Sequence, residues 1–293
     1  MEFIEAKHII NPTSSSSWFG LDYNMNIYKG CCHGCIYCDS RSNCYNIIDF
    51  DKVRAKKNSS IIIENELRKK IKKGVIGTGA MSDPYNPFEK KYELTKNALN
   101  LVDKYGFGIS IATKSSLIAR DKNIIKRISE HSPTLIKITI TTYNDNMSKK
   151  VEPNVCPSSE RFKAIKELSK EGIFTGILLM PVLPFLEDSK ENVLNVVKLA
   201  HENGAKFIYP SFGMTLRNNQ REWYFNKLDS LYPNLKAKYI KEYGFSYECR
   251  SIYWKELYSL FSEECTKYGI LYKMKDIITA YKSPYKNEQL TLF

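Results

Sequence analysis

Short apolar runs alternate along the chain with longer segments in which apolar residues recur every three to four positions. The short runs predict strands at residues 24–28, 75–79, 108–112, 135–141, 175–180 and 206–209. The periodic segments between them predict helices near residues 61–73, 94–105, 123–131, 160–171 and 191–203. Alternation of this kind builds a parallel sheet with right-handed crossovers. The pattern predicts an α/β fold, a partial (β/α)6 TIM-like barrel with its chemistry at the carboxyl ends of the strands.

The fourth run supports this placement. Lys137, Thr139 and Thr141 alternate there with three isoleucines, so one face of the strand is polar and the other is apolar. An edge strand of an antiparallel sheet would show the same alternation. The order of elements along the chain favours a barrel, in which the polar face lines an open mouth.

The strand-helix alternation stops near residue 215, where the composition shifts towards Tyr, Trp, Lys and Arg. We therefore expect three parts. Residues 1–215 form the barrel with an N-terminal arm, residues 216–282 form a helical C-terminal subdomain, and residues 283–293 form a flexible tail.

Composition excludes several classes of protein. The 293 residues are 43% hydrophobic and 26% charged, as in soluble globular proteins and unlike disordered or fibrous chains. The apolar stretch 172–186 is too short to span a membrane, and the N-terminus lacks signal-peptide features, so we expect a cytoplasmic protein. The net charge of +12 favours a polyanionic partner such as nucleic acid, although a uniformly basic proteome would produce the same charge.

Three cysteines stand at close spacing in the loop after the first predicted strand. Cys31, Cys35 and Cys38 form a C-x-x-x-C-x-x-C pattern, with Gly30 and Gly34 allowing tight turns. Iron-sulfur cubanes usually take four cysteine ligands, so three would leave one iron open to a substrate or cofactor.

The alternative for this loop is a structural zinc site with Cys44 or His33 as fourth ligand. Zinc sites more often pair two C-x-x-C elements across a longer insert, which this chain lacks. The spacing therefore favours the cluster.

With the aromatic Tyr37 before its last cysteine, the motif resembles that of the radical S-adenosylmethionine (SAM) superfamily. Within the superfamily, residues 5–210 resemble the spore photoproduct lyase group. The matching stretches are Tyr28-Lys29-Gly30-Cys31, Ser82-Asp83-Pro84-Tyr85, Thr113-Lys114, Glu152-Pro153 with Arg161, and residues 181–184 followed by Asp188.

The resemblance implies a [4Fe-4S] cluster on Cys31, Cys35 and Cys38, with SAM chelating the open iron. Reduction by a donor such as flavodoxin or ferredoxin would cleave SAM to methionine and a 5'-deoxyadenosyl radical. Ser82 and Lys114 match positions that hold the methionyl end of SAM, and a lysine at a strand end suits a carboxylate. Thr139 is a further candidate on the polar face.

Two departures from the group bear on the reaction. The cysteine that returns a hydrogen atom to the lyase's product is replaced by Ala80, and a tyrosine after the last cluster cysteine is replaced by Asp39. The lyase's own hydrogen relay is therefore not expected here. Tyr37 and Cys156 are candidate catalytic residues, and Cys249 is another thiol that could supply hydrogen, although unassigned cysteines are mostly small buried hydrophobes.

Residues 217–258 hold seven tyrosines with Trp223 and Trp254, interleaved with Lys and Arg. Aromatic rings that stack on bases, with cations for phosphates, suit nucleic acid, and helices packed onto a barrel would give the same composition.

We predict a radical SAM enzyme acting on DNA in repair or modification. RNA, a protein or a small molecule is the alternative substrate, and a zinc-bearing nucleic-acid-binding module is the second alternative.

The last five residues, Gln289, Leu290, Thr291, Leu292 and Phe293, resemble the pentapeptide that attaches bacterial replication and repair proteins to the DNA sliding clamp. Glutamine can hydrogen-bond at the edge of a cleft while the last two residues fill an apolar pocket. The tail therefore predicts clamp binding, with packing onto the protein's own core as the alternative.

Overall fold

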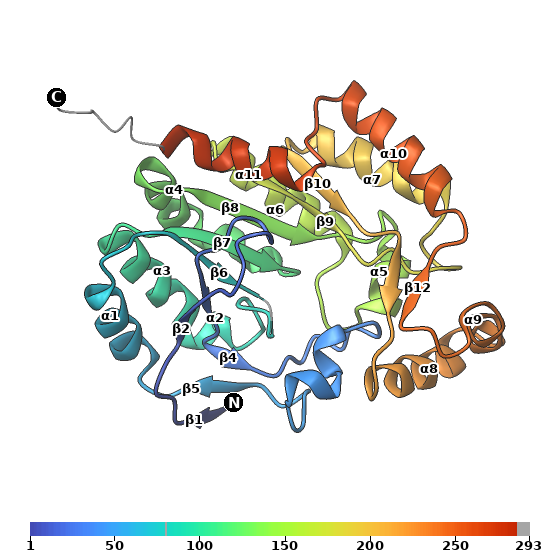
Figure 1. The fold of residues 1–293 in the computed structure, drawn as a ribbon, viewed down its shortest axis with the longest axis horizontal. Helices are drawn as coiled ribbons and strands as arrows, with labels where there is room; N and C mark the ends of the chain where they lie inside the picture. The colour runs from blue at the N-terminus through green and yellow to red at the C-terminus, as the bar shows by residue number, and fades with distance from the viewer. Residues whose placement is uncertain (80, 286–293) are drawn as a thin grey trace.

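The computed structural model describes residues 1–79 and 81–285, and its centre is a seven-stranded sheet (Figure 1). The strand order is β10-β9-β8-β7-β6-β3-β2, and every neighbouring pair is parallel except β2 and β3. The bounds are β2 (Ile10–Pro12), β3 (Tyr23–Met25), β6 (Val75–Thr78), β7 (Gly108–Thr113), β8 (Thr134–Thr139), β9 (Thr175–Leu179) and β10 (Phe207–Pro210). The predicted fold class, a partial barrel of six parallel strands, is confirmed.

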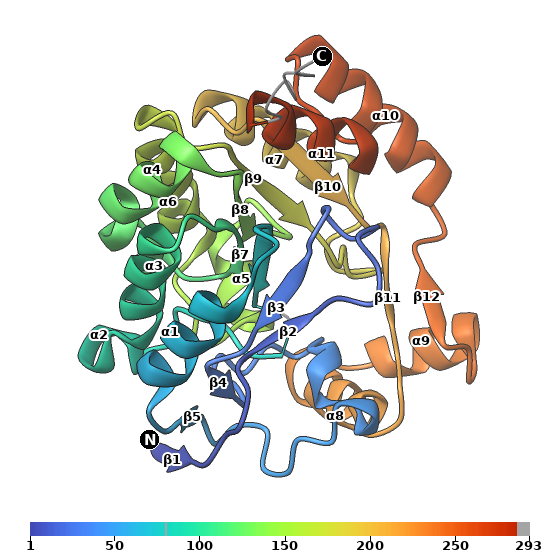
Figure 2. The same ribbon diagram turned by 60° about the vertical axis from the view of Figure 1, so that its left-hand side comes forward.

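Helices cover the outer face of this sheet, where Figure 2 shows them in an arc. They are α1 (Ser59–Lys69), α3 (Leu94–Lys104), α4 (Lys122–His131), α6 (Ser158–Lys170) and α7 (Lys190–Glu202), with the short helices α2 (Glu89–Tyr92) and α5 (Asp145–Val151) in connections. The apolar face of β8, formed by Ile136 and Ile138, is fully buried in the core under these helices. Burial of this face leaves the polar face of β8 for the inside of the barrel.

The strand predicted at residues 24–28 is in fact two. After β3 the chain leaves the main sheet and forms β4 (Tyr28–Lys29), which pairs with β5 (Arg54–Lys56), itself paired with β1 (Glu2–Ile4). Two short turns of 3-10 helix, residues 39–41 and 43–45, follow the cysteine loop. The cysteine loop begins directly after β4, so this small sheet positions it at the carboxyl edge of the barrel.

The C-terminal region packs in two places (Figures 1 and 2). Helices α8 (Gln220–Leu231) and α9 (Leu235–Tyr243) lie at one end of the molecule, next to the antiparallel pair β11 (Gly213–Thr215) and β12 (Glu248–Arg250). Helix α10 (Trp254–Lys267) packs on α7, and α11 (Met274–Lys282) meets the N-terminal arm, where Tyr281 donates a hydrogen bond of 2.6 Å to the Phe19 carbonyl. The C-terminal region is thus helical apart from this short strand pair.

None of the helices in the described ranges is long and apolar enough to cross a bilayer. The clamp-like residues Gln289, Leu290, Leu292 and Phe293 lie outside the described residues, as does Ala80. The expectations stated for them remain predictions.

Candidate active site

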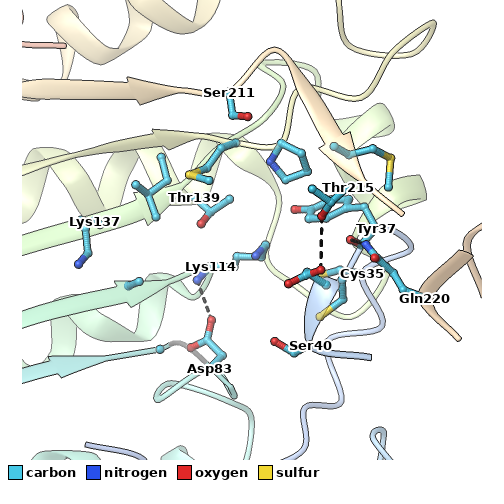
Figure 3. Close-up of a pocket in the computed structure, with 18 of the residues that line it drawn as sticks. Cys35, Tyr37, Ser40, Asp83, Lys114, Lys137, Thr139, Ser211, Thr215 and Gln220 are labelled. Atoms are coloured by element: carbon cyan, nitrogen blue, oxygen red, sulfur yellow. Dashed lines mark hydrogen bonds between the residues drawn. The ribbon is translucent and has the colours of Figure 1, made fainter. Parts of the chain in front are cut away.

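A cavity of about 810 Å³ lies at the carboxyl ends of the parallel strands. Its lining includes the last residue of four strands: Thr78, Thr113, Thr139 and Pro210. Figure 3 shows side chains of the cysteine loop on one side of this space and those of the strands on the other. This is the edge at which the sequence places the chemistry.

The three thiols of the predicted cluster, Cys31, Cys35 and Cys38, all line this cavity as free cysteines. Cys32, in the same loop, does not line it, and Cys44 is exposed. Among residues 1–79 and 81–285, no three His, Cys, Asp or Glu side chains gather closely enough to hold a single metal ion. The three predicted ligands therefore face one cavity, and the other two cysteines nearby in the sequence do not line it.

The start of the cysteine loop is held by backbone contacts. Gly30 has φ of +79°, and a Cβ there would lie 2.6 Å from the Lys52 carbonyl oxygen, so only glycine fits. The Cys31 amide donates to the Phe50 carbonyl at 2.8 Å. The first thiol is therefore fixed by the chain that leads into β5.

The other side of the loop is held by helix α8. Trp223 donates its indole N–H to the Cys35 carbonyl at 3.4 Å, and the Gln220 amide donates to the Tyr37 carbonyl at 3.0 Å. The guanidinium of Arg41 lies 3.7 Å from the centre of the Trp223 ring. Trp223, one of the two tryptophans singled out in the sequence, thus supports the cysteine loop.

Asp83 connects the cysteine loop with the end of β7. Its carboxylate accepts hydrogen bonds from the Thr113 hydroxyl at 2.6 Å and the Lys114 amide at 2.8 Å, and it lies 3.6 Å from His33 Nδ1. In the sequence, Asp83 stands out only as one residue of the stretch Ser82-Asp83-Pro84-Tyr85. Its partners lie far apart in the sequence, so its role as a connector is visible only in the fold.

Ser82 and Lys114 both line the cavity, as the SAM-binding prediction requires. The Ser82 hydroxyl donates to the Gly30 carbonyl at 2.6 Å, which leaves its oxygen lone pairs available as acceptors. Burial acts to lower the pKa of Lys114, but the nearby Cys35, Glu152 and Cys38 outweigh it, and the pKa lies above its usual value. A charged ammonium therefore lies beside the cysteines.

A buried ion pair lies behind the cysteine loop. Arg161 Nη2 is 2.5 Å from Glu152 Oε2, and both side chains are at most 1% exposed. Tyr37 donates its phenol to Glu152, and Arg161 donates to the Thr139 carbonyl at 2.9 Å. Burial acts to raise the pKa of Glu152, but Arg161 and Lys114 outweigh it and hold the pKa below its usual value. The ionised pair thus connects the cysteine loop to the end of β8.

The remaining candidate residues differ in whether they line the cavity. Tyr37 and Thr139 line the cavity. Cys156 does not; its thiol lies 3.4 Å from the Lys114 carbonyl oxygen and accepts the Ser116 amide. Cys249 does line the cavity from β12, where burial raises the pKa of its thiol to about 11.

The C-terminal region supplies part of the cavity wall through Arg250, Trp254 and Tyr258. The guanidinium of Arg250 lies 4.9 Å from the centre of the Trp254 ring, and Tyr258 is 41% exposed. The second tryptophan singled out in the sequence therefore belongs to the cavity. From the N-terminal arm, Trp18 also lines the cavity, which no local pattern in the sequence indicates.

The model of the radical SAM superfamily matches residues 25–197. Uncharacterized relatives include a protein of Methanocaldococcus jannaschii, 35% identical over 191 residues (63% of this chain and 68% of that protein). Another, from Mycobacterium tuberculosis, is 26% identical over 245 residues (81% of this chain and 72% of that protein).

Among solved structures, a spore photoproduct lyase variant matches with a TM-score of 0.68 at 12% identity, covering 92% of this chain and 81% of that one. A second variant, solved with bound AdoMet (SAM) and dinucleoside spore photoproduct, matches with a TM-score of 0.66 at 12% identity and the same coverage. At this level of identity the likeness is one of fold.

Proposed function

The chain belongs to the radical SAM superfamily, and on that premise we propose that it is a radical SAM enzyme acting on DNA in repair or modification. The observation that carries the proposal is that the thiols of Cys31, Cys35 and Cys38 line one cavity with Lys114. These residues fit a [4Fe-4S] cluster with SAM beside it, because three thiols leave one iron free and the lysine offers a cation to a carboxylate.

When bound and reduced, such a cluster supplies the electron that cleaves SAM to methionine and a 5'-deoxyadenosyl radical. The chain's own residues bind and orient around that chemistry. Lys114 holds the SAM carboxylate, Ser82 and Thr139 offer acceptors to its polar atoms, and Asp83 fixes the backbone at Lys114. Apolar residues such as Leu178 and Met180 line the wall and exclude water from the reacting groups.

Lys114→Ala will weaken SAM binding by roughly 1.5–3 kcal/mol, the contribution of one charge-assisted hydrogen bond. Equilibrium binding to the anaerobically reconstituted protein measures this, and iron content checks that the cluster survives. Lys126→Ala is the matched control, since that lysine pairs with Glu171 on the outer surface at 3.0 Å. Equal SAM affinity in the Lys114 and Lys126 variants would show that Lys114 does not hold SAM.

DNA is the substrate class that the charge and the cavity wall favour. The protein carries a net charge of +12, and Arg250, Trp254 and Tyr258 bring a cation and two aromatic rings to the cavity. Such groups bind phosphates and stack on bases. A spore photoproduct lyase of similar fold was solved with a dinucleoside spore photoproduct. RNA, protein or small-molecule substrates are the alternative.

Trp254→Ala will lower affinity for single-stranded DNA by about 1–3 kcal/mol, the usual contribution of one stacked base. Trp223→Ala is the matched comparison, because that ring supports the cysteine loop and its loss should reduce protein stability instead. Titrations at several salt concentrations, with melting curves for each variant, separate the two effects. Loss of stability without loss of affinity in Trp254→Ala would assign that ring to packing.

The function is tested by anaerobic incubation with SAM, a reductant and candidate nucleic acids, followed by mass analysis of each polymer. Flavodoxin and ferredoxin are the proposed electron donors. Spore photoproduct should be converted little or not at all, because Ala80 stands where the lyase has its hydrogen-donating cysteine. A mass change in RNA or protein but never in DNA would overturn the DNA assignment and leave the radical SAM chemistry intact.

A further inference from the structure

Lys137 lies inside the barrel, on the polar face of β8, and lines the cavity. Figure 3 places it on the opposite side of the cavity from Cys35 and Tyr37. The side chain is 2% exposed. The chain therefore buries an amine at the end of the cavity away from the cluster cysteines.

The contacts of this amine do not neutralise it. Lys137 Nζ donates to the Ser110 hydroxyl at 2.6 Å and lies 4.6 Å from the centre of the Phe19 ring. No carboxylate of the described residues forms an ion pair with it, although the cysteine end of the cavity contains several acidic groups. An ammonium has three donors, and a single hydroxyl acceptor leaves hydrogen-bonding capacity unused.

Burial without a counter-charge is unfavourable, and it lowers the pKa of Lys137 to about 7. An apolar side chain at this position would fill the space without that cost. Packing alone thus gives no reason for a lysine here, and a ligand that brings negative charge would.

Side chains suited to such a ligand line the same cavity as Lys137. Its partner on β7 is the small Ala112, which lines the same cavity. Trp18, the neighbour of Phe19 in the N-terminal arm, also lines the cavity and is 44% exposed, and Asn24 adds an amide from β3. An aromatic ring and an amide suit a planar base, and the unpaired ammonium suits the phosphate attached to it.

We propose that Lys137 binds a phosphate of the substrate nucleotide, within a subsite formed with Trp18 and Asn24 at the end of the cavity away from the cluster. This inference rests on the proposed nucleic-acid substrate and specifies which part of it enters the barrel. Ser110 positions the ammonium, and Phe19 closes the space behind it.

Binding of small probes to the SAM-bound holoenzyme tests the proposal. The wild-type protein should bind thymidine 5'-monophosphate about tenfold more tightly than thymidine, the factor expected of one charge-assisted hydrogen bond. Lys137→Met and Lys137→Gln should bind both probes equally. Lys126→Met is the control, because Lys126 pairs with Glu171 and does not line the cavity, and it should keep the preference.

Stability of the unloaded protein gives a second readout. Because Lys137→Met removes a buried amine that has no counter-charge, its melting temperature should rise by about 2–4 °C at neutral pH. A lower melting temperature in both Lys137 variants would assign the lysine a structural role and overturn the proposal. So would an unchanged preference for the monophosphate.

The outcomes also separate this inference from the DNA assignment. A Lys137-dependent preference for the monophosphate, with no reaction on DNA, would support the subsite and overturn the DNA assignment. Reaction on DNA with equal probe binding in wild type and Lys137→Met would overturn the subsite alone. Lys137-dependent binding of acetate or glutamate in place of the monophosphate would overturn it in favour of a carboxylate-bearing substrate.

Discussion

Replacing any one of Cys31, Cys35 or Cys38 with alanine will abolish the iron-sulfur cluster, and with it all cleavage of SAM. Each thiol lines the cavity from a different position of the loop, and the fold places no fourth loop cysteine there to substitute. With two ligands left, the cluster has lost a third of its attachment to the protein. Iron and sulfide content after anaerobic reconstitution, and 5'-deoxyadenosine released from SAM, measure the loss.

Cys32→Ala and Cys44→Ala are the matched controls and should keep a full cluster. Neither residue lines the cavity, and Cys44 instead accepts a hydrogen bond from Arg217 at 2.8 Å on the surface. Two results would contradict the assignment: an intact cluster in Cys35→Ala, or zinc in place of iron in the wild-type protein.

Arg161→Met will destabilise the protein by roughly 3–5 kcal/mol, because it leaves a buried carboxylate without its cation. The substitution leaves the Glu152 carboxylate without its counter-charge. It also removes the donors to the Thr139 and Cys156 carbonyls, at 2.9 Å each. Urea unfolding of the protein without its cofactors measures the change in the free energy of unfolding.

Arg127→Met is the comparison, since Arg127 pairs with Asp103 at 2.9 Å but is half exposed. Exposed pairs contribute about 0–1 kcal/mol, so this variant should unfold almost as the wild type does. Adding Glu152→Gln to Arg161→Met should recover part of the lost stability by removing the stranded charge. If the double variant is no more stable than Arg161→Met, an unpaired charge is not the cause.

The barrel could be predicted from sequence because each strand and helix carries its own periodicity. In β8, alternate isoleucines face the helices while Lys137 and Thr139 face the cavity, and both directions follow from one short segment. The division of residues 24–28 into β3 and β4 could not be predicted. It depends on β5, a strand of three residues about twenty-five positions further along, with no apolar pattern of its own.

The candidate site, like the fold, can be predicted from the sequence only in part. The cysteines are close in sequence, so their spacing alone indicates a cluster. The residues that hold them are not: Arg161 reaches Glu152 and Thr139 across two elements, and Asp83 joins three segments. Trp18 and Lys137 lie far apart in the sequence but line one cavity, because the N-terminal arm folds across the barrel and places Phe19 against the Lys137 ammonium. Contacts between distant segments leave no periodic trace in a sequence.

The hydrogen bonds from α8 to the cysteine loop have a practical consequence for anyone who shortens this chain. The family match ends at residue 197, yet the donors to the Cys35 and Tyr37 carbonyls are Trp223 and Gln220. A recombinant fragment cut at the family boundary would lose both donors and expose the back of the loop to solvent and oxygen. We therefore expect the smallest fragment that holds the predicted cluster to extend at least through α8, and a graft of this loop onto another scaffold to need that helix as well as the cysteines.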